Sequence, residues 1–192
     1  MTVTQLAAEI CSRAGEGYQN YTARALAHFK SAVLALLNTS MSPDVDAPGL
    51  CATFTDENYD STGGILLSDI YTALDLSDAK ILSIELKQRP LERITPQQYE
   101  VSKLRPELLD DNVWYYIYEG EEEVGGIIRI VSTMRIPPQE DPAAKLVVRA
   151  IGWRAELSST ASNISIESYF STNMLEKAIM LSTEELKREI VA

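Results

Sequence analysis

The sequence predicts an α+β fold in which a small antiparallel β domain is inserted into a helical bundle. Apolar residues recur at helical spacing near both ends of the 192-residue chain, whereas residues 81–157 contain short alternating segments separated by proline, glycine and an acidic hairpin tip. We expect three parts: residues 1–64 with two helices and a long loop, 65–157 as the inserted β domain with one short helix, and 158–192 as a C-terminal helix and tail completing the bundle.

The three long helices are predicted from apolar stripes. Val3–Ala14 carries its apolar residues three or four apart and is followed by Gly15, a residue common just after helix ends. Similar stripes predict helices over 20–37 and 166–190. Residues 38–64 are expected to form a long loop, because proline, glycine and short polar residues interrupt every period. The mixed apolar spacing of residues 65–76 fits either a strand or a helix.

Strands of the inserted domain are predicted from alternation and from β-branched or aromatic content. The expected strands are 82–86, 91–94, 113–118, 127–131 and 145–153, with a turn at Arg89 and Pro90. In strand 113–118, Trp114, Tyr116 and Tyr118 lie on one face and Tyr115 and Ile117 on the other, and we expect both faces to be covered. Thr95, Pro96 and Gln98 have the spacing of a capping box and predict a short helix through Lys103.

Charge and cysteine content limit the possible functions. A formal net charge of -11 and a pI near 4.6 argue against wrapping nucleic acid, because such binding depends on clustered Lys and Arg. Cys11 and Cys51 have no metal-ligand spacing, which favours a reducing compartment and no zinc. Neither a secretory signal nor a membrane-spanning segment is expected.

The candidates for catalysis are weak. His28 is the single histidine and is interpreted as a helix-surface residue, because a general-base histidine needs partners that the sequence does not place beside it. Asp110, Asp111 and the trio Glu121, Glu122 and Glu123 could hold Mg²⁺ or perform acid–base chemistry, but solvated loops explain them better. We therefore expect no enzyme, no catalytic or metal site and no cofactor.

The end of the chain differs from the rest of the C-terminal helix. Residues 184–192 mix charged groups with Leu186, Ile190 and Val191, so we expect the last turn to expose apolar groups unless a partner receives them.

The order of these elements resembles the head-to-tail adaptor (connector) proteins of tailed bacteriophages. The resemblance lies in the run ILSIELKQRPLERITPQQYE, then WYYIYEG, then GGIIRIV followed by prolines, then KLVVRAIGW, and a long helix from Ile166. It covers about the last two-thirds of the chain, and the first third only as two helices. Residues 38–64 have no counterpart that can be aligned.

The resemblance implies a structural virion protein that is assembled in the host cytoplasm and located in the virion neck. Its partners would be the portal protein, copies of itself in a ring that is usually dodecameric, and a tail or nozzle protein, while DNA passes through the ring without sequence-specific binding. It assigns Leu186, Ile190 and Val191 to the portal contact, and Glu121, Glu122 and Glu123 to a rim that faces neighbouring subunits or the tail. An acidic inner wall suits a conduit, because it offers phosphates no partner.

Two other functions stay open. One is a monomeric protein-binding module, such as an immunity or regulatory protein, that grips one partner with its long loop and aromatic strand. The other is a small metal-dependent hydrolase built on Asp110, Asp111 and the trio from Glu121 to Glu123.

Overall fold

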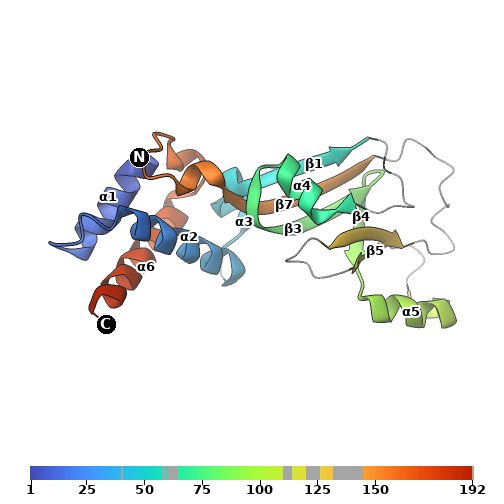
Figure 1. Ribbon diagram of the computed structural model, residues 1–192. Helices are drawn as coiled ribbons and strands as arrows, with labels where there is room; N and C mark the ends of the chain where they lie inside the picture. Colours follow the sequence, from blue (N-terminus) through green and yellow to red (C-terminus); the bar gives the residue numbers. More distant parts are fainter. Residues whose placement is uncertain are drawn as a thin grey trace. The chain divides into compact units, whose positions relative to one another are not determined.

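A computed structural model describes residues 1–39, 41–57, 59, 65–109, 114–119, 126–131 and 145–191. The chain divides into two compact units (Figure 1). The helical unit consists of Met1–Cys51 and Ile151–Ala192, and the β unit consists of Ala52–Ala150. The predicted α+β class is confirmed. The β unit interrupts the helical unit in sequence, with limits at 52 and 150 where we expected 65 and 157.

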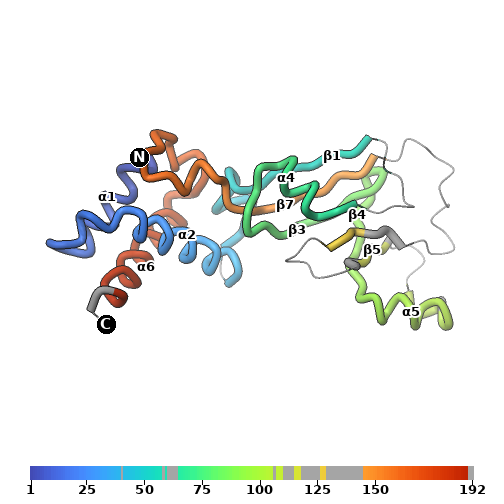
Figure 2. Tube along the Cα trace, viewed as in Figure 1, coloured from blue at the N-terminus to red at the C-terminus, as the bar shows by residue number. Residues whose placement is uncertain are grey.

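Three helices form the body of the helical unit: α1 (Val3–Ala14), α2 (Thr22–Thr39) and α6 (Thr172–Val191). They pack against one another in all three pairs, and Figure 2 shows their traces side by side. The apolar periodicity identified the packed faces of α1 and α2, because every residue of the two predicted stripes is buried. The stripe residues are Leu6, Ala7, Ile10 and Ala14 in α1, and Ala25, Leu26, Phe29, Val33, Leu36 and Leu37 in α2. The structure adds Val3, Cys11 and Ala32 to the buried faces. The bounds of α1 are as predicted, and α2 lies two residues further along the chain than expected.

The C-terminal helix begins later than predicted, at Thr172 rather than Ile166. Ile166–Ser168 instead forms a short 3₁₀ turn, η4, and the chain then reaches Ser171. The Ser171 hydroxyl accepts a hydrogen bond from the Met174 backbone N–H at 3.2 Å, the arrangement of a helix N-cap. The apolar residues at 166 and 170 are buried, but they belong to the segment that leads into the helix.

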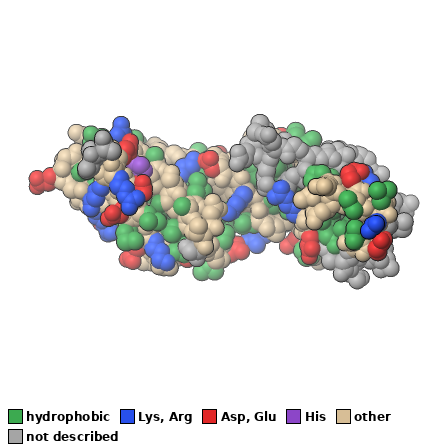
Figure 3. Space-filling model, turned by 90° about the horizontal axis from the view of Figure 1, so that it is seen from below, with side chains coloured by type: hydrophobic (Ala, Val, Ile, Leu, Met, Phe, Trp, Pro, Cys, Tyr) green, Lys and Arg blue, Asp and Glu red, His purple; other side chains and the backbone are tan. Residues whose placement is uncertain are grey.

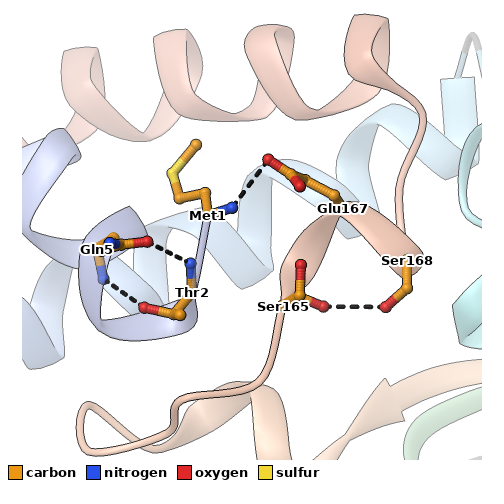
Figure 4. Close-up of polar contacts among 6 residues, drawn as sticks. All are labelled: Met1, Thr2, Gln5, Ser165, Glu167 and Ser168. Carbon is orange, nitrogen blue, oxygen red and sulfur yellow. Dashed lines mark hydrogen bonds and ion pairs between the residues drawn. The ribbon is translucent and has the colours of Figure 1, made fainter.

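The start of the chain is fixed against the segment before α6 (Figure 4). Thr2 caps α1: its hydroxyl accepts from the Gln5 N–H at 3.2 Å, and the Gln5 side chain accepts from the Thr2 N–H at 2.8 Å. The amine of Met1 pairs with a carboxylate oxygen of Glu167 at 2.8 Å, and Thr2 forms a β-bridge with Ser165. Residues that are more than 160 positions apart are thereby joined in one local network.

Residues 38–64 were expected to be a long loop, and for the described residues this is wrong. They form α3 (Pro43–Asp46), the 3₁₀ turn η1 (Pro48–Leu50) and β1 (Cys51–Asp56). The order comes from long-range contacts: the Ser171 N–H donates to the Asp46 carbonyl at 2.7 Å, and the Ser171 hydroxyl donates to the Asp46 carboxylate at 3.0 Å. A local sequence period contains no information about such contacts.

An aromatic cluster occupies the core of the helical unit. Phe29 of α2 lies edge-on to Trp153, with ring centroids 6.2 Å apart, and edge-on to Phe170, at 5.7 Å. All three rings are almost fully buried, and the Trp153 indole N–H donates to the Ser158 hydroxyl at 2.8 Å. The cluster therefore satisfies its one polar group while burying three large apolar surfaces.

The sheet contains seven strands: β1, β2 (Ile65–Leu66), β3 (Leu76–Leu86), β4 (Arg89–Arg93), β5 (Trp114–Glu119), β6 (Ile127–Val131) and β7 (Leu146–Arg154), in the order β1-β7-β3-β4-β5-β6-β2. Residues 65–76, which the sequence left open, form β2, the helix α4 (Leu67–Ala73) and the start of β3. The β5–β6 hairpin is as predicted, with Glu119 opposite Ile127.

Two details of the sheet differ from expectation. The β4 and β5 strands pair in parallel, with Leu91 opposite Trp114, because the helix α5 (Pro96–Leu104) lies between them and carries the chain back to the same end of the sheet. The β3–β4 turn lies at Lys87 and Gln88, not at Arg89 and Pro90. Both turn residues have positive φ, 51° and 65°, as a tight hairpin requires, although neither residue is typical of such a turn.

Both faces of β5 are covered where side chains are described, as predicted. Tyr116 lies in the main core of the β unit, with Leu91 and Ile128. Tyr115 and Ile117 lie on the other face, in a smaller core with Ile94 and with the partly buried Tyr99 of α5. The alternation therefore identified two cores correctly, and it places α5 over the second one.

A substitution at Gly49 can test the packing of η1 against the segment before α6. A Cβ at this position would meet the Tyr169 Cα at 2.5 Å and the Ser168 carbonyl oxygen at 2.9 Å, both backbone atoms that cannot rotate away. We predict that Gly49→Ala lowers the free energy of unfolding by about 1–3 kcal/mol, measured by urea denaturation followed by tryptophan fluorescence. The control Ser31→Ala, on the exposed face of α2, is expected to change it by less than about 0.5 kcal/mol. Equal stability of the two variants would contradict the packing described.

The predicted capping box of α5 is present. The Gln98 N–H donates to the Thr95 hydroxyl at 3.1 Å, and the Thr95 N–H donates to the Gln98 side chain at 2.8 Å. Thr95→Ala should cost the helix about 1 kcal/mol, which is roughly a five-fold faster amide exchange across α5. Thr95→Ser keeps the hydroxyl and is expected to preserve the wild-type rates. Exchange in the alanine variant as slow as in wild type would show that other contacts hold the start of α5.

Candidate interaction surfaces

The most exposed group of large apolar side chains in the described residues lies on α5 and on the 3₁₀ turn η2 (Pro106–Leu108) that follows it. We call Val101, Leu104 and Leu108 the α5 strip. Their exposed fractions are 43%, 85% and 58%. Val101 and Leu104 are three residues apart in α5 and lie on the same side of that helix, and Leu108 belongs to η2, which begins after the helix has ended. On the right of Figure 3, hydrophobic side chains lie among charged ones on the surface of the β unit.

The inward side of α5 is unusual, because its buried residue is Ser102. The Ser102 hydroxyl donates to the Tyr99 carbonyl at 2.7 Å, so its burial leaves no polar group unsatisfied. Tyr99 supplies the contact with the smaller core of the β unit. The helix therefore attaches to the sheet through Tyr99 while Val101 and Leu104 are exposed, which is the reverse of ordinary amphipathic packing.

Exposure of this kind has a measurable cost. Fully burying a leucine or valine side chain is worth about 1.5–3 kcal/mol relative to leaving it in water. A partner that covered the α5 strip would therefore gain binding free energy by removing these side chains from water. Single exposed apolar residues are common, but groups of them with a polar border are typical of protein–protein contacts.

Charged residues border the α5 strip. Glu100 and Lys103 pair at 2.6 Å, and the Lys103 ammonium lies 4.5 Å from the centre of the Tyr99 ring. The hydrogen bond to Glu100 raises the pKa of Lys103 above its ordinary value. Arg105 and Glu107 are exposed, and their side chains make no hydrogen bond or ion pair with any residue that the structure describes. They are available to a partner.

Sequence reasoning predicted the helix but missed the strip. The signal was present: Val101, Leu104 and Leu108 recur at helical spacing, as core residues do. An apolar stripe predicts that one face is covered, and it does not say whether the cover is the same chain or another one. The decisive information, that Tyr99 alone among the apolar residues of α5 packs on the sheet, comes from the structure.

A second exposed apolar group lies on α6. We call Met180 and Leu181 the α6 pair, and their exposed fractions are 57% and 37%. Lys177 precedes both residues by one helical turn and Glu184 follows both by one turn. Neither charged group has a hydrogen-bond or ion-pair partner in the described part of the chain.

The predicted portal contact at the end of α6 needs correction. Leu186 is fully buried in the helical unit, so the expectation that it is exposed there is wrong. The stripe of buried residues in α6 continues through Ser182 and Thr183 to Leu186, which places this leucine on the packed side. Ile190 and Val191 form the last turn of α6, and their side chains lie outside the described residues. The predicted rim residues Glu121, Glu122 and Glu123 also lie outside them.

The end of α6 is joined to α2 by a charged cluster. The Glu189 carboxylate contacts His28 Nε2 at 2.7 Å and Arg24 Nη1 at 3.1 Å. The hydrogen bond to His28, together with the charge of Arg24, lowers the pKa of Glu189 below its ordinary value of 4.5. His28 is thus partly covered and has a structural partner, which fits its interpretation as a helix-surface residue.

The remaining candidates for chemistry gain no support from geometry. Asp110 and Asp111 lie outside the described residues. The described part of the chain contains no group of three or more His, Cys, Asp or Glu placed to hold a metal ion. Cys11 borders a hollow of about 200 Å³ near the end of α1. Burial raises the pKa of its thiol, which keeps the thiol protonated and unreactive.

No protein-family model matches this chain, and no curated protein is significantly similar to it. Among the described residues, no helix combines the length and the apolar character that crossing a membrane requires.

The charged cluster predicts a pH dependence. A carboxyl whose pKa is lowered by folding stabilises the fold above its ordinary pKa, and this contribution is lost as the pH falls through the lower, folded value. We therefore expect Glu189→Gln to be less stable than wild type at about pH 6, and the difference to shrink as the pH falls below the ordinary pKa of 4.5. Thermal unfolding followed by circular dichroism across this pH range measures it. Glu176→Gln, on the same helix and without a partner in the described residues, should show no such convergence. A pH-independent difference for Glu189→Gln would contradict the cluster's role.

Proposed function

We propose that this chain is a structural protein of a tailed-bacteriophage virion, a head-to-tail adaptor whose copies form a ring between the portal and the tail. The observation that carries the proposal is the α5 strip, a group of apolar side chains held on the outside of a capped helix. A surface of this kind acts by binding protein. The sequence resemblance supports an assembly in which such a chain binds its own copies and a portal.

The distribution of charge supports a conduit for DNA. Residues 52–150 contain 18 acidic and 10 basic side chains, a balance of -8 within the total of -11. The helical unit carries the remaining -3 and is nearly balanced. A ring with an acidic lining repels phosphates and lets DNA slide, because it offers the backbone no cations to pair with. The acidic residues of the inserted unit are the candidates for such a lining.

The portal contact is proposed to lie at the last turn of α6, on Ile190 and Val191. Leu186 is excluded from this contact, because its side chain lies in the core of the helical unit. A deletion of residues 184–192 would therefore damage the fold as well as the contact. Substitutions at Ile190 and Val191 test the portal contact more directly, because they leave Leu186 in the core.

A monomeric binding module is the alternative that the same surface allows. In that case the α5 strip receives one partner, and copies of the chain do not meet. The two functions predict different complexes, one copy per partner against a closed ring on a portal.

Electron microscopy with portal rings from the genome that encodes this chain tests the proposal. We predict that the chain adds a ring of density to the portal, and that the double substitution Ile190→Asp and Val191→Asp abolishes this addition. Ala35→Asp, on the exposed face of α2, makes the same kind of change away from the contact and should leave the addition intact. A chain that adds no density to the portal, or that binds it as isolated single copies, would overturn the adaptor function.

A further inference from the structure

We propose that the α5 strip of one copy binds the α6 pair of a second copy, so that identical chains associate through two unlike surfaces. This inference deepens the proposed function and rests on it, because a ring of one kind of subunit requires two different patches that fit each other. The α5 strip belongs to the β unit and the α6 pair to the helical unit. Each chain therefore offers both halves of the contact.

The α5 strip and the α6 pair are both small groups of exposed large apolar side chains. In the described residues, these are the two places where exposed large apolar side chains occur as neighbours on a helical surface; Val45 and Leu66 are exposed singly. One surface is α5 with the η2 turn that follows it, and the other is the middle of α6. Two helices such as α5 and α6 can pack by placing the side-chain ridge of one into the groove of the other.

The charges at the borders are complementary. The α5 strip is bordered by Arg105 and Glu107, one cation and one anion without partners in the described residues. The α6 pair is bordered by Glu184 and Lys177, again one anion and one cation without described partners. We assign Arg105 to Glu184 and Glu107 to Lys177. Charges of this kind at the rim of an interface fix its register and favour the correct pairing over others.

The fold of each surface favours association without rearrangement. Hydrogen bonds of the capping box and the contact of Tyr99 with the smaller core hold α5 as a helix before any partner arrives. On α6, the residues beside the pair are fixed in the packed face, where Ser182 and Thr183 are buried and donate to carbonyls of their own helix. Preformed surfaces lose less conformational entropy on binding.

Complementation between two defective variants tests the contact directly. Leu104→Glu disables the α5 strip, and Met180→Glu disables the α6 pair; both positions are exposed, so the fold of each unit should be unaffected. Sedimentation velocity is measured up to about 1 mM chain. Wild type is expected to self-associate, each variant alone to associate at least about ten-fold more weakly, and an equimolar mixture to form a heterodimer and nothing larger. Ala35→Glu, outside both surfaces, should associate as wild type does.

Three results would overturn the inference: a wild-type chain that stays monomeric throughout, a mixture that forms no heterodimer, or a Met180→Glu variant that still associates fully. The last result would indicate a symmetric contact of α5 with α5. A charge exchange gives an independent measurement, in which Arg105→Glu and Glu184→Arg each weaken association by about five-fold and their combination in one chain restores it. Failure of that restoration would overturn the assigned register.

The outcomes separate this inference from the proposed function. If the chain binds no portal but the mixture forms heterodimers, the adaptor function fails and the contact between copies stands. If rings form on the portal and Leu104→Glu forms them equally well, the adaptor function stands and the contact assigned here fails.

Discussion

The contact between Phe29, Trp153 and Phe170 is the interaction on which the helical unit depends. These three residues come from α2, from the end of β7 and from the segment before α6, so they join both ends of a chain that the β unit interrupts. Truncating a buried aromatic residue to alanine costs about 3–5 kcal/mol, a large share of the 5–15 kcal/mol that holds a typical domain together. Without this cluster, α6 would have fewer contacts to bring it back to α1 and α2.

The insertion of about 100 residues does not make that return costly. Closing a flexible loop of this length would cost roughly 4 kcal/mol in chain entropy. Because β1 and β7 are neighbours in the sheet, the folded insertion brings its own two ends together and removes most of this cost. The folded β unit thus keeps the two halves of the helical unit close together along the chain, and contacts within the helical unit, such as Ser171 with Asp46, can form at little entropic expense.

Local patterns in the sequence predicted most of the elements. The apolar stripe of α1, the capping box of α5, the alternation in β5 and the β5–β6 hairpin all depend on residues within one turn or one strand pair, so they could be identified without knowing the rest of the fold. Residues 43–56 could not be predicted in the same way. Their order comes from Asp46 and Gly49 meeting the segment at Tyr169 and Ser171, more than 100 residues away.

The candidate surfaces show a second limit of pattern reasoning. Leu186 was predicted to be exposed because charged neighbours surround it, yet the buried face of α6 passes through Ser182 and Thr183, whose hydroxyls bond to carbonyls one turn earlier. Once those hydroxyls are satisfied within the helix, polar residues can lie in a core and the apolar stripe is longer than a hydropathy pattern suggests. In α5 a serine is buried in the same way, but there the apolar side chains beside it are exposed.

Ser102 is buried and satisfied by Tyr99 in its own helix, which frees Val101 and Leu104 from any need to pack inward. The capping box and the contact of Tyr99 with the smaller core hold the helix, whereas Leu104 is largely exposed and buries little surface within the chain. The contact proposed between copies would bury these side chains and recover the free energy that their exposure costs. On that proposal, the fold of the single chain holds the α5 strip in the position in which a second copy meets it.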